Sequence, residues 1–476
     1  MTSNHHVIAI LGDVAEYING RAFKPSEWGK EGLPIIRIKN LNDKNSKFNY
    51  SNEVFEKRYL VKKGDLLFAW SASLGAYIWK KDEAWLNQHI FLVKPSPFIA
   101  KLYLYYFLDK ITQELYSAAH GSGMVHVTKK KFEETKIGLP PLPEQRAIVA
   151  KIEQLFSELD NGIACLKKAQ EQLKVYRQAV LKQAFDGELT KTWREQQANL
   201  PSAQDLLDTI KAEREQTAKN QGKKLKPIKP ITQTELSEWS ELPDGWKWVR
   251  VDEILQSGRE CGYGVLQPGE NVVNGVSLIR VGDVFDGRID YLNLKKISLD
   301  IANKYKRTFL QGGEVLITLV GAIGRTAVVP EFCKGANIAR AVGVVPLSKK
   351  LNPFFVELYF RQAKKIQELT DKSHEVARKT LNLEDVKNAT VIIAPLAEQE
   401  QIVQEIETRL SVCDNMGATI REALEKAEAL RQSILKKAFE GKLLSDEELT
   451  ATRNDPDWEP AGKLLERIKA EKNQSK

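Results

Sequence analysis

The sequence lacks the long apolar runs and the paired cysteines that mark membrane proteins and disulfide-rich proteins. No apolar run approaches the ~20 residues that a membrane-spanning helix needs. The first residues do not place a basic segment before an apolar one, as a signal peptide does. The four cysteines lie far apart and form no CxxC pair, which argues against a zinc framework and favours reduced thiols. We therefore expect a cytoplasmic protein without a membrane partner.

The short motifs of several enzyme classes are also missing. The GxxxxGK[ST] phosphate-binding loop does not occur, and GAIGRTA (321–327) fails that pattern. The [DNS]PP[YFW] element of amino-group methyltransferases is absent as well. The six histidines do not have the spacing of metal ligands. We therefore expect no catalytic residue, no metal and no cofactor in this chain.

The length and the charge distribution point to more than one polyanion-binding domain. A chain of 476 residues is long enough for two to four domains. Lys and Arg outnumber Asp and Glu by 20 to 14 in residues 1–142 and by 22 to 18 in residues 241–396. The remaining residues carry 29 basic against 31 acidic side chains. Positive charge concentrated in two segments is typical of two nucleic-acid-binding domains, although random surface charge explains it equally well.

An internal repeat organises the whole sequence. A shift of 254 residues places PLPEQRAIVAKIEQLFSELDN (141–161) on PLAEQEQIVQEIETRLSVCDN (395–415). The match continues without a gap to RQAVLKQAFDGEL and RQSILKKAFEGKL, and after a short slip LLDTIKAE (206–213) matches LLERIKAE (464–471). Chance does not produce this similarity, so the chain contains two copies of one module.

Both copies of the repeat predict a long helix. Apolar residues recur every three or four positions, acidic residues lie in the first turn, and FDG or FEG ends each copy. A narrow apolar stripe over some forty residues is typical of a coiled coil, so we expect the helices to pair antiparallel. The stripe consists of Ile148, Ile152, Leu155, Leu159, Ile163, Leu166, Leu173, Tyr176 and Val180 in the first copy, and of Ile402, Ile406, Leu410, Cys413, Ile420, Leu424, Leu430 and Ile434 in the second.

The segments that precede the two helices resemble each other weakly. LPIIRIKNL (33–41) corresponds to VSLIRVGDV (276–284), and KKGDLLFAWSASLGAYIW (62–79) corresponds to QGGEVLITLVGAIGRTAVV (311–329). Each has alternating strand residues, a Gly–acid turn and a small-residue loop, so we predict two globular α+β domains. The predicted order is domain (1–142), long helix (143–190), helical segment and linker (191–240), domain (241–396), long helix (397–445) and helical tail (446–476).

These paired motifs resemble the specificity subunits of type I restriction–modification systems. The resemblance rests on PLPEQ/PLAEQ, on the RQ…AF helix ends, on the LLxxIKAE tails, on LPDGW (242–246) and on GDLLF (64–68). The first domain departs from it, because HHVIAILGD has no LPxGW before it. The resemblance implies two target-recognition domains that read an asymmetric bipartite DNA target. It also implies two adenine methyltransferase subunits that use S-adenosylmethionine, and restriction subunits that use ATP and Mg²⁺. In that case this chain is not itself an enzyme.

Base readout needs Arg, Lys, Asn, Gln or hydroxyl groups on loops that enter the major groove. We predict three such loops in each domain, one after each of two strands and one before the helical part, together with basic clusters for phosphate contacts. Each of these residues is as easily explained as a solvated loop residue. The predicted DNA-binding residues are Arg37, Lys39, Asn40, Trp70, Ser71, Ser73, Gln88, His89, Lys129, Lys130 and Lys131 in the first domain, and Arg280, Thr318, Arg325, Asn337, Arg340, Arg378 and Lys379 in the second.

Polar residues that recur in both helices are the predicted methyltransferase contacts. These are Glu144, Gln145, Arg177 and Gln178 in the first helix, and Glu398, Gln399, Arg431 and Gln432 in the second. Two other functions remain open. One is a methyltransferase or nuclease with its own recognition domains, and the other is a coiled-coil scaffold whose domains bind proteins.

Overall fold

A computed structural model describes residues 6–43, 45–118, 128–237, 239–375 and 379–474. The chain divides into two compact units. Unit 1 contains residues 1–167 and 421–476, and unit 2 contains residues 168–420. Because the first unit combines both ends of the chain, its core is assembled from segments that are remote in sequence. No helix among the described residues is long and apolar enough to cross a membrane.

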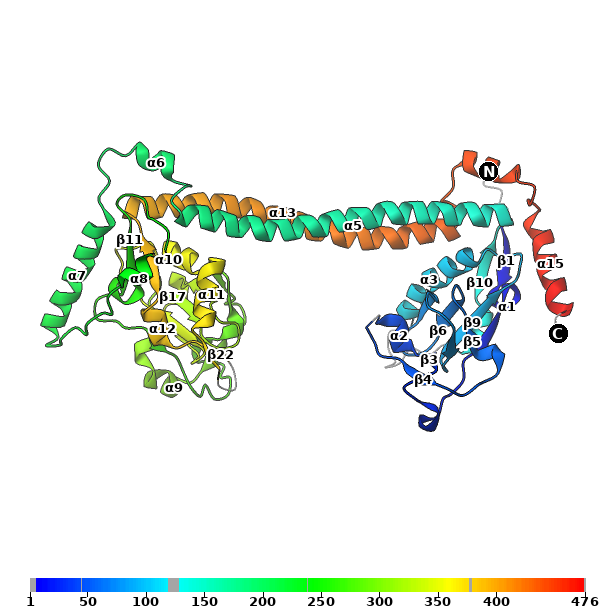
Figure 1. The fold of residues 1–476 in the computed structure, drawn as a ribbon, viewed down its shortest axis with the longest axis horizontal. Helices are drawn as coiled ribbons and strands as arrows, with labels where there is room; N and C mark the ends of the chain where they lie inside the picture. The colour runs from blue at the N-terminus through cyan, green and yellow to red at the C-terminus, as the bar shows by residue number, and fades with distance from the viewer. Residues whose placement is uncertain (1–5, 44, 119–127, 238, 376–378, 475–476) are drawn as a thin grey trace. The chain divides into compact units, whose positions relative to one another are not determined.

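The globular part of unit 1 is an α+β domain built on two four-stranded sheets (Figure 1). The sheets have the strand orders β2-β9-β6-β7 and β4-β3-β8-β5, and a separate pair joins β1 to β10. The strands are β1 (Val7–Ile10), β2 (Ala15–Asn19), β3 (Leu33–Ile36), β4 (Asn49–Ser51), β5 (Leu60–Val61), β6 (Leu66–Ala69), β7 (Gly75–Ile78), β8 (Ala84–Leu86), β9 (Ile90–Pro95) and β10 (Lys136–Leu139). The helices are α1 (Leu11–Val14), α2 (Ile38–Asn42), α3 (Lys101–Ala118) and α4 (Lys129–Glu133), with 3₁₀ turns η1 (Pro25–Glu27) and η2 (Lys57–Tyr59).

The domain of unit 2 repeats this design. Its sheets have the orders β12-β20-β17-β18 and β16-β13-β19, and β11 pairs with β23. The strands are β11 (Lys247–Arg250), β12 (Gly262–Tyr263), β13 (Val276–Ile279), β14 (Val284–Phe285), β15 (Arg288–Ile289), β16 (Lys295–Ile297), β17 (Val315–Thr318), β18 (Thr326–Val328), β19 (Asn337–Ile338), β20 (Val342–Val345), β21 (His374–Glu375), β22 (Lys379–Thr380) and β23 (Thr390–Ile393). The helices are α8 (Gln233–Ser237), α9 (Leu299–Lys304), α10 (Pro353–Phe360), α11 (Ala363–Asp371) and α12 (Leu383–Lys387), with 3₁₀ turns η3 (Val251–Ile254), η4 (Val281–Asp283), η5 (Lys306–Thr308) and η6 (Glu331–Cys333).

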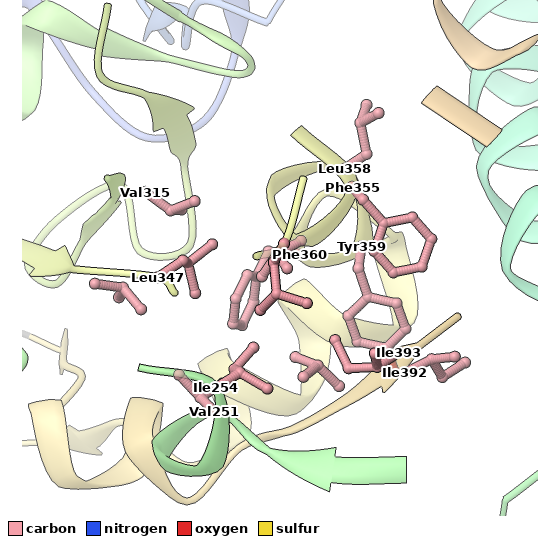
Figure 2. Packing of buried hydrophobic residues seen from close by; sticks show 14 of the residues in the cluster. Val251, Ile254, Val315, Leu347, Phe355, Leu358, Tyr359, Phe360, Ile392 and Ile393 are labelled. Atoms are coloured by element: carbon pink, nitrogen blue, oxygen red, sulfur yellow. The ribbon is translucent and has the colours of Figure 1, made fainter. Parts of the chain in front are cut away.

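Helix α10 closes the core of unit 2 against its sheets. Its sequence PFFVELYF is apolar on nearly every face, as expected for a helix that is buried all round. Figure 2 shows Tyr359 pointing from this helix toward Ile392 and Ile393, and Phe360 pointing toward Ile254. The same cluster includes side chains from both long helices, so the domain and its helices share one hydrophobic core.

The two domains have corresponding strand orders although their sequences match only weakly. In both, a Gly–acid turn with a left-handed glycine, Gly64 or Gly313, precedes the central strand. The turn carboxylate, Asp65 or Glu314, accepts a hydrogen bond from the backbone three residues earlier. The predicted α+β repeat is therefore confirmed, and it extends to the whole domain.

The long helices are α5 (Leu142–Phe185) and α13 (Leu396–Phe439). In unit 1, Ile148 and Ile152 near the start of α5 share a core with Leu435 near the end of α13. In unit 2, Val180 near the end of α5 shares a core with Ile402 near the start of α13. The predicted antiparallel pairing is thus confirmed (Figure 1).

The predicted stripe is wrong at one repeat-related pair of residues. Tyr176 and its counterpart Leu430 are 45 % and 50 % exposed. The apolar spacing drifts around a straight helix, so a three-and-four pattern carried over some forty residues leaves the seam in places. Phe156, which the stripe omitted, is buried in unit 1.

Each domain also packs against a helix that comes after one of the long helices in the chain: α7 (Ala203–Asn220) follows α5, and α15 (Ala461–Gln474) follows α13. In unit 2, α7, which follows the short α6 (Lys191–Glu195), packs against η3. In unit 1, α14 (Asp446–Arg453) precedes α15, which packs against α1 and β1. Leu464 and Ile468 of α15 are buried in the core of unit 1. The segment predicted as a tail is therefore part of the first domain's fold.

Candidate nucleic-acid interface

The three predicted loops of the first domain meet at one end of its two main sheets. The amide of Asn42, at the end of α2, donates a hydrogen bond to the hydroxyl of Ser73 at 2.9 Å. The rings of Trp70 and His89 touch edge to face, with centroids 4.9 Å apart. The backbone N–H of Asn87 donates to the carbonyl of Ile36 at 3.2 Å. Segments from three separate parts of the sequence thus form one continuous surface.

Two backbone positions on this surface are in an unusual conformation. Ala72 and His89 have φ values of 61° and 72°, and they are the only non-glycine residues with positive φ in the described part of the chain. Both lie in loops that the sequence predicted for DNA contact. The buried Nδ1 atom of His89 has no hydrogen-bond partner among the described residues. Such strained positions concentrate at functional sites, because a loop selected only for stability avoids them.

The corresponding loops of the second domain also meet. The N–H of Ala339 donates to Ile279 at 2.9 Å, and the N–H of Leu319 donates to Ala341 at 2.8 Å. Val320 forms a bridge with Thr380, which brings the β21–β22 hairpin and Lys379 to the same place. Gly321, with φ 80°, occupies the loop position that Ala72 holds in the first domain. Both domains therefore carry the same loop arrangement with different side chains.

Four predicted DNA-binding residues are corrected by their burial. Thr318 and Asn337 are fully buried, and Asn40 and Ser71 are nearly so. The Thr318 hydroxyl accepts a hydrogen bond from the N–H of Arg325 at 2.9 Å and so closes its own loop. The amide of Asn337 bonds to Thr308 at 2.7 Å and to the carbonyl of Tyr305. These side chains hold the loops in shape and offer little surface to a base.

Asn40 belongs to a turn that occurs in both domains. Its side-chain oxygen accepts a hydrogen bond from the backbone of Arg37, as the carboxylate of Asp283 does from Arg280. Asp283 also binds the Arg280 guanidinium with two oxygens at 3.0 Å, which raises the pKa of Arg280. Arg37 instead lies over the ring of Trp28. The two arginines hold equivalent positions, but Arg280 is bound by a carboxylate whereas Arg37 lies over an aromatic ring.

The other predicted residues lie at or near the surface. Arg325 is half-buried above the ring of Phe285, and Ser73 is half-buried beside Asn42. The lysines of α4 point outward while Phe132 of the same helix packs on Phe68 in the core. Arg378 lies outside the described residues. The exposed predicted residues are Lys39, Gln88, Lys129, Lys130, Lys131, Arg280, Arg340 and Lys379.

Sequence reasoning missed several residues of these surfaces. Asn19 accepts a hydrogen bond from the indole of Trp70 at 3.1 Å. Arg21 pairs with Glu27 at 2.6 Å and lies over Phe55. Arg288 is exposed on the β14–β15 hairpin, over Phe285. Strand pairing places all three near the predicted loops, and no local motif could have indicated this.

Comparisons with known proteins agree with this architecture. A family model for the type I restriction modification DNA specificity domain matches residues 8–171 and again residues 243–426. The chain belongs to this family. It is 33 % identical over 472 residues to the EcoBI specificity subunit of Escherichia coli, covering 97 % of this chain and 91 % of that protein. It is 24 % identical to the EcoKI specificity subunit of Escherichia coli strain K12, covering 98 % and 95 %.

A solved structure shares the fold of this family member. It is described as the structural basis of complex assembly and conformational transition of the type I R-M system. The TM-score is 0.64 at 19 % identity, and the match covers 92 % of this chain and 98 % of the other. The two-domain, two-helix architecture is thus a known one.

The Glu–Gln pair at each helix start is not available to a partner, which corrects that prediction. Gln145 and Gln399 are fully buried. Gln145 accepts from the N–H of Ala100 and donates to the carbonyl of Pro140. Gln399 does the same with Asn352 and Ala394. Each glutamine therefore fastens the start of a long helix to its own domain.

The glutamates beside them reach the first residues of each domain. Glu398 accepts hydrogen bonds from the indole of Trp246 and the guanidinium of Arg194, both at 2.8 Å. Glu144 lies 2.5 Å from the ring of His6. Because β1 and β11 pair with their partner strands in equivalent register, His6 occupies the position of Trp246. The first domain thus keeps this contact without an LPxGW lead-in.

The repeated arginines join the two long helices within each unit. Arg177 pairs with Asp414 at 2.6 Å in unit 2, and Arg431 pairs with Asp160 in unit 1. A shift of 254 residues turns one pair into the other. Gln178 is exposed but accepts a hydrogen bond from the N–H of Ala363. Gln432 is half-buried.

Proposed function

We propose that this chain selects the DNA target of a type I restriction–modification complex. The first domain reads one half of a bipartite, asymmetric target and the second domain reads the other half. Adenine methyltransferase subunits that use S-adenosylmethionine, and restriction subunits that use ATP and Mg²⁺, carry out the chemistry in the cytoplasm. This chain supplies recognition and no catalytic group.

One observation carries the proposal. The same domain fold occurs twice on nearly repeated helices, yet the exposed side chains of its loops differ between the copies. Arg340 stands where the first domain has Gln88, and the Thr318–Arg325 loop stands where it has Trp70 and Ser73. Two readers with one scaffold and different contact residues suit a target whose halves differ.

The decisive experiment maps methylated adenines in the genome of the source cell with and without this chain. We expect a bipartite, non-palindromic methylated sequence that disappears when the chain is deleted and returns when it is restored. Methylation that continues without the chain would contradict the proposal. Methyl-donor binding by the purified chain alone would favour a methyltransferase with its own recognition domains.

We further propose that the methyltransferase subunits bind the long helices at Tyr176 and Leu430. These two residues are related by the repeat, and both are about half exposed although they are large and apolar. In unit 2, Val412 and Met416 lie one helical turn apart on α13 and are also exposed. Because Arg177 contacts Asp414, they lie at a similar level to Tyr176 along the helices. Exposed apolar residues on a helix pair are suited to packing against further helices.

Co-purification of the tagged chain with its methyltransferase tests this surface. We expect Tyr176→Asp combined with Leu430→Asp to lose most of the methyltransferase. The matched controls are Val273→Asp and Val54→Asp, since these valines are 86 % and 91 % exposed on loops of the two domains. Full recovery of methyltransferase with the helix variants, or equal loss with the controls, would contradict this surface.

A further inference from the structure

Gln88 and Arg340 hold the same backbone position in the two domains. The N–H of Gln88 donates to the carbonyl of Arg21 at 2.8 Å, and the N–H of Arg340 donates to Val265 at 2.9 Å. The bridge between Arg21 and Asn87 is repeated between Val265 and Ala339. Gln88 and Arg340 therefore each come directly after the residue that forms this parallel bridge.

The residues on either side make the same backbone hydrogen bonds in both domains. Before the position, the N–H groups of Asn87 and Ala339 donate to the ends of β3 and β13. After it, the carbonyl of His89 accepts from Trp70 at 3.1 Å, and the carbonyl of Ala341 accepts from Leu319 at 2.8 Å. The backbone is therefore fixed on both sides, which prepares the side chain between for contact at little entropic cost.

Both side chains are exposed where the three loops of their domain meet. Unlike Arg280, which is bound by Asp283, Arg340 makes no side-chain hydrogen bond or ion pair with another described residue, and neither does Gln88. In the second domain Arg340 lies between Ala339 and Ala341, so it is the one long side chain of its turn. A fixed backbone that presents one unpaired polar side chain is what direct readout of a base requires.

We propose that Gln88 and Arg340 are the same base-reading position of the two domains, Gln88 reading an A·T pair and Arg340 a G·C pair. A glutamine amide can donate from its NH2 group to N7 of adenine while its carbonyl oxygen accepts from N6. A guanidinium has two parallel donors, which match O6 and N7 of guanine. This assignment rests on the proposed function, and it adds the kind of base that each domain prefers at this position.

Reciprocal substitutions in the complete methyltransferase complex test the assignment, with the methylated sequence as the readout. We expect Arg340→Gln to weaken the preference for a G·C pair at one position of the second domain's half-site by about 5- to 150-fold, which is the range of one bidentate contact. The preference there should shift toward A·T, while the other half-site stays unchanged. Gln88→Arg should produce the opposite shift, at one position of the first domain's half-site.

Two further variants separate base contact from phosphate contact. Arg340→Lys keeps the charge but replaces the planar pair of donors with a single flexible ammonium, so we expect a weaker preference for G·C than in the wild type, still stronger than in Arg340→Gln. Arg307→Gln removes an exposed arginine from η5 of the same domain and should leave the methylated sequence unchanged.

Three results would overturn the assignment. The first is a wild-type target without a required G·C pair in the second domain's half. The second is uniform weakening of all targets by Arg340→Gln, with full rescue by lysine, as a phosphate contact would give. The third is a change in both half-sites from one substitution. In each case methylation would still depend on the chain, whereas failure of the proposed function would show as methylation that continues without it.

Discussion

At the residue scale, the repeated glutamines show how a sequence signal can be real and yet have a different cause. Gln145 and Gln399 recur because each satisfies two backbone groups at the start of a long helix. Buried backbone groups that lose their partners cost more free energy than the hydrogen bond itself contributed. A repeated polar residue can therefore reflect the folding of each copy, with no external partner involved.

We expect Gln399→Ala to lower the free energy of unfolding of unit 2 by about 2 kcal/mol, because it leaves Asn352 N–H and the carbonyl of Ala394 without partners. Urea unfolding followed by tryptophan fluorescence measures the effect. The neighbouring Glu400→Ala, at an exposed position, should change stability by less than about 0.5 kcal/mol. Similar effects of the two substitutions would contradict the structural role of Gln399.

A second residue-scale prediction concerns Glu357, which is buried under β18 and accepts a hydrogen bond from Thr326 at 2.9 Å. Burial raises the pKa of Glu357 from 4.5 to about 7. As the pH rises from 4.5 to 7, the unfolded chain loses this proton before the folded chain does. The carboxyl therefore reduces the stability of the folded state increasingly across this window.

We expect Glu357→Gln to stabilise unit 2 at pH 8 by up to about 3 kcal/mol, and to have little stabilising effect at pH 4. Thermal unfolding of both proteins at a series of pH values measures the difference. The pH 4 measurement is the internal control, since both side chains are then neutral. A difference in melting temperature that does not grow between pH 4 and pH 8 would show that Glu357 ionises normally.

At the scale of elements, the long helices are joined by two ion pairs that the repeat relates to each other. Asp160 and Asp414 bind Arg431 and Arg177, respectively, and Arg431 also lies over the ring of Phe156. The apolar stripe is narrow, and Ile163, Leu166 and Leu173 in the middle of α5 are only partly buried. Charged contacts of this kind contribute little stability but help to select the register of two helices.

A double-mutant cycle in unit 1 tests the register contact. We expect Asp160→Arg and Arg431→Asp each to destabilise unit 1 by about 1 kcal/mol, since each places like charges together. The two changes combined should recover most of the loss, because they restore an ion pair in reversed orientation. Additive losses in the double variant, seen in urea unfolding at low salt, would argue against a direct contact.

At the scale of the whole molecule, segments that pack together can lie far apart in the sequence. The last helix, α15, lies against the first domain, where Ser96 donates a hydrogen bond to Glu471 at 2.8 Å. The equivalent helix α7 lies against η3 of the second domain. The first domain therefore needs a helix from the far end of the chain, whereas α7 lies within the continuous segment of unit 2.

This arrangement makes a prediction about domain exchange. Replacing residues 1–142 with the equivalent domain of a relative should change one half of the methylated sequence and leave the other half intact. The hybrid should be more stable when residues 446–476 come from the same relative, because Leu464 and Ile468 are buried in the first domain's core. Exchange of residues 446–476 alone should leave the methylated sequence unchanged. A change in both halves after the domain exchange would contradict two independent readers.

The sequence by itself determined the features that depend on local periodicity and on self-similarity. The spacing of apolar residues predicted the start of both long helices to within one residue, and the FDG and FEG motifs mark where the helices end, although the predicted segments extended five or six residues further. The 254-residue repeat predicted two modules, and the weak strand similarity predicted an α+β domain in each. Gly162 and Gly417 do not interrupt the helices, because packing along the helix outweighs the propensity of one residue.

Only the tertiary structure decided which polar side chains face outward and which segments complete each domain. Asn337, Gln145 and Gln399 look like contact residues in the sequence, but they are buried and bonded to partners remote in the chain. Strand pairing likewise revealed that Gln88 and Arg340 share one position, although the surrounding sequences differ in length and composition. Burial and equivalence of this kind depend on contacts between distant segments. A local pattern contains no information about such contacts, whereas the folded chain fixes them through its hydrogen bonds and core packing.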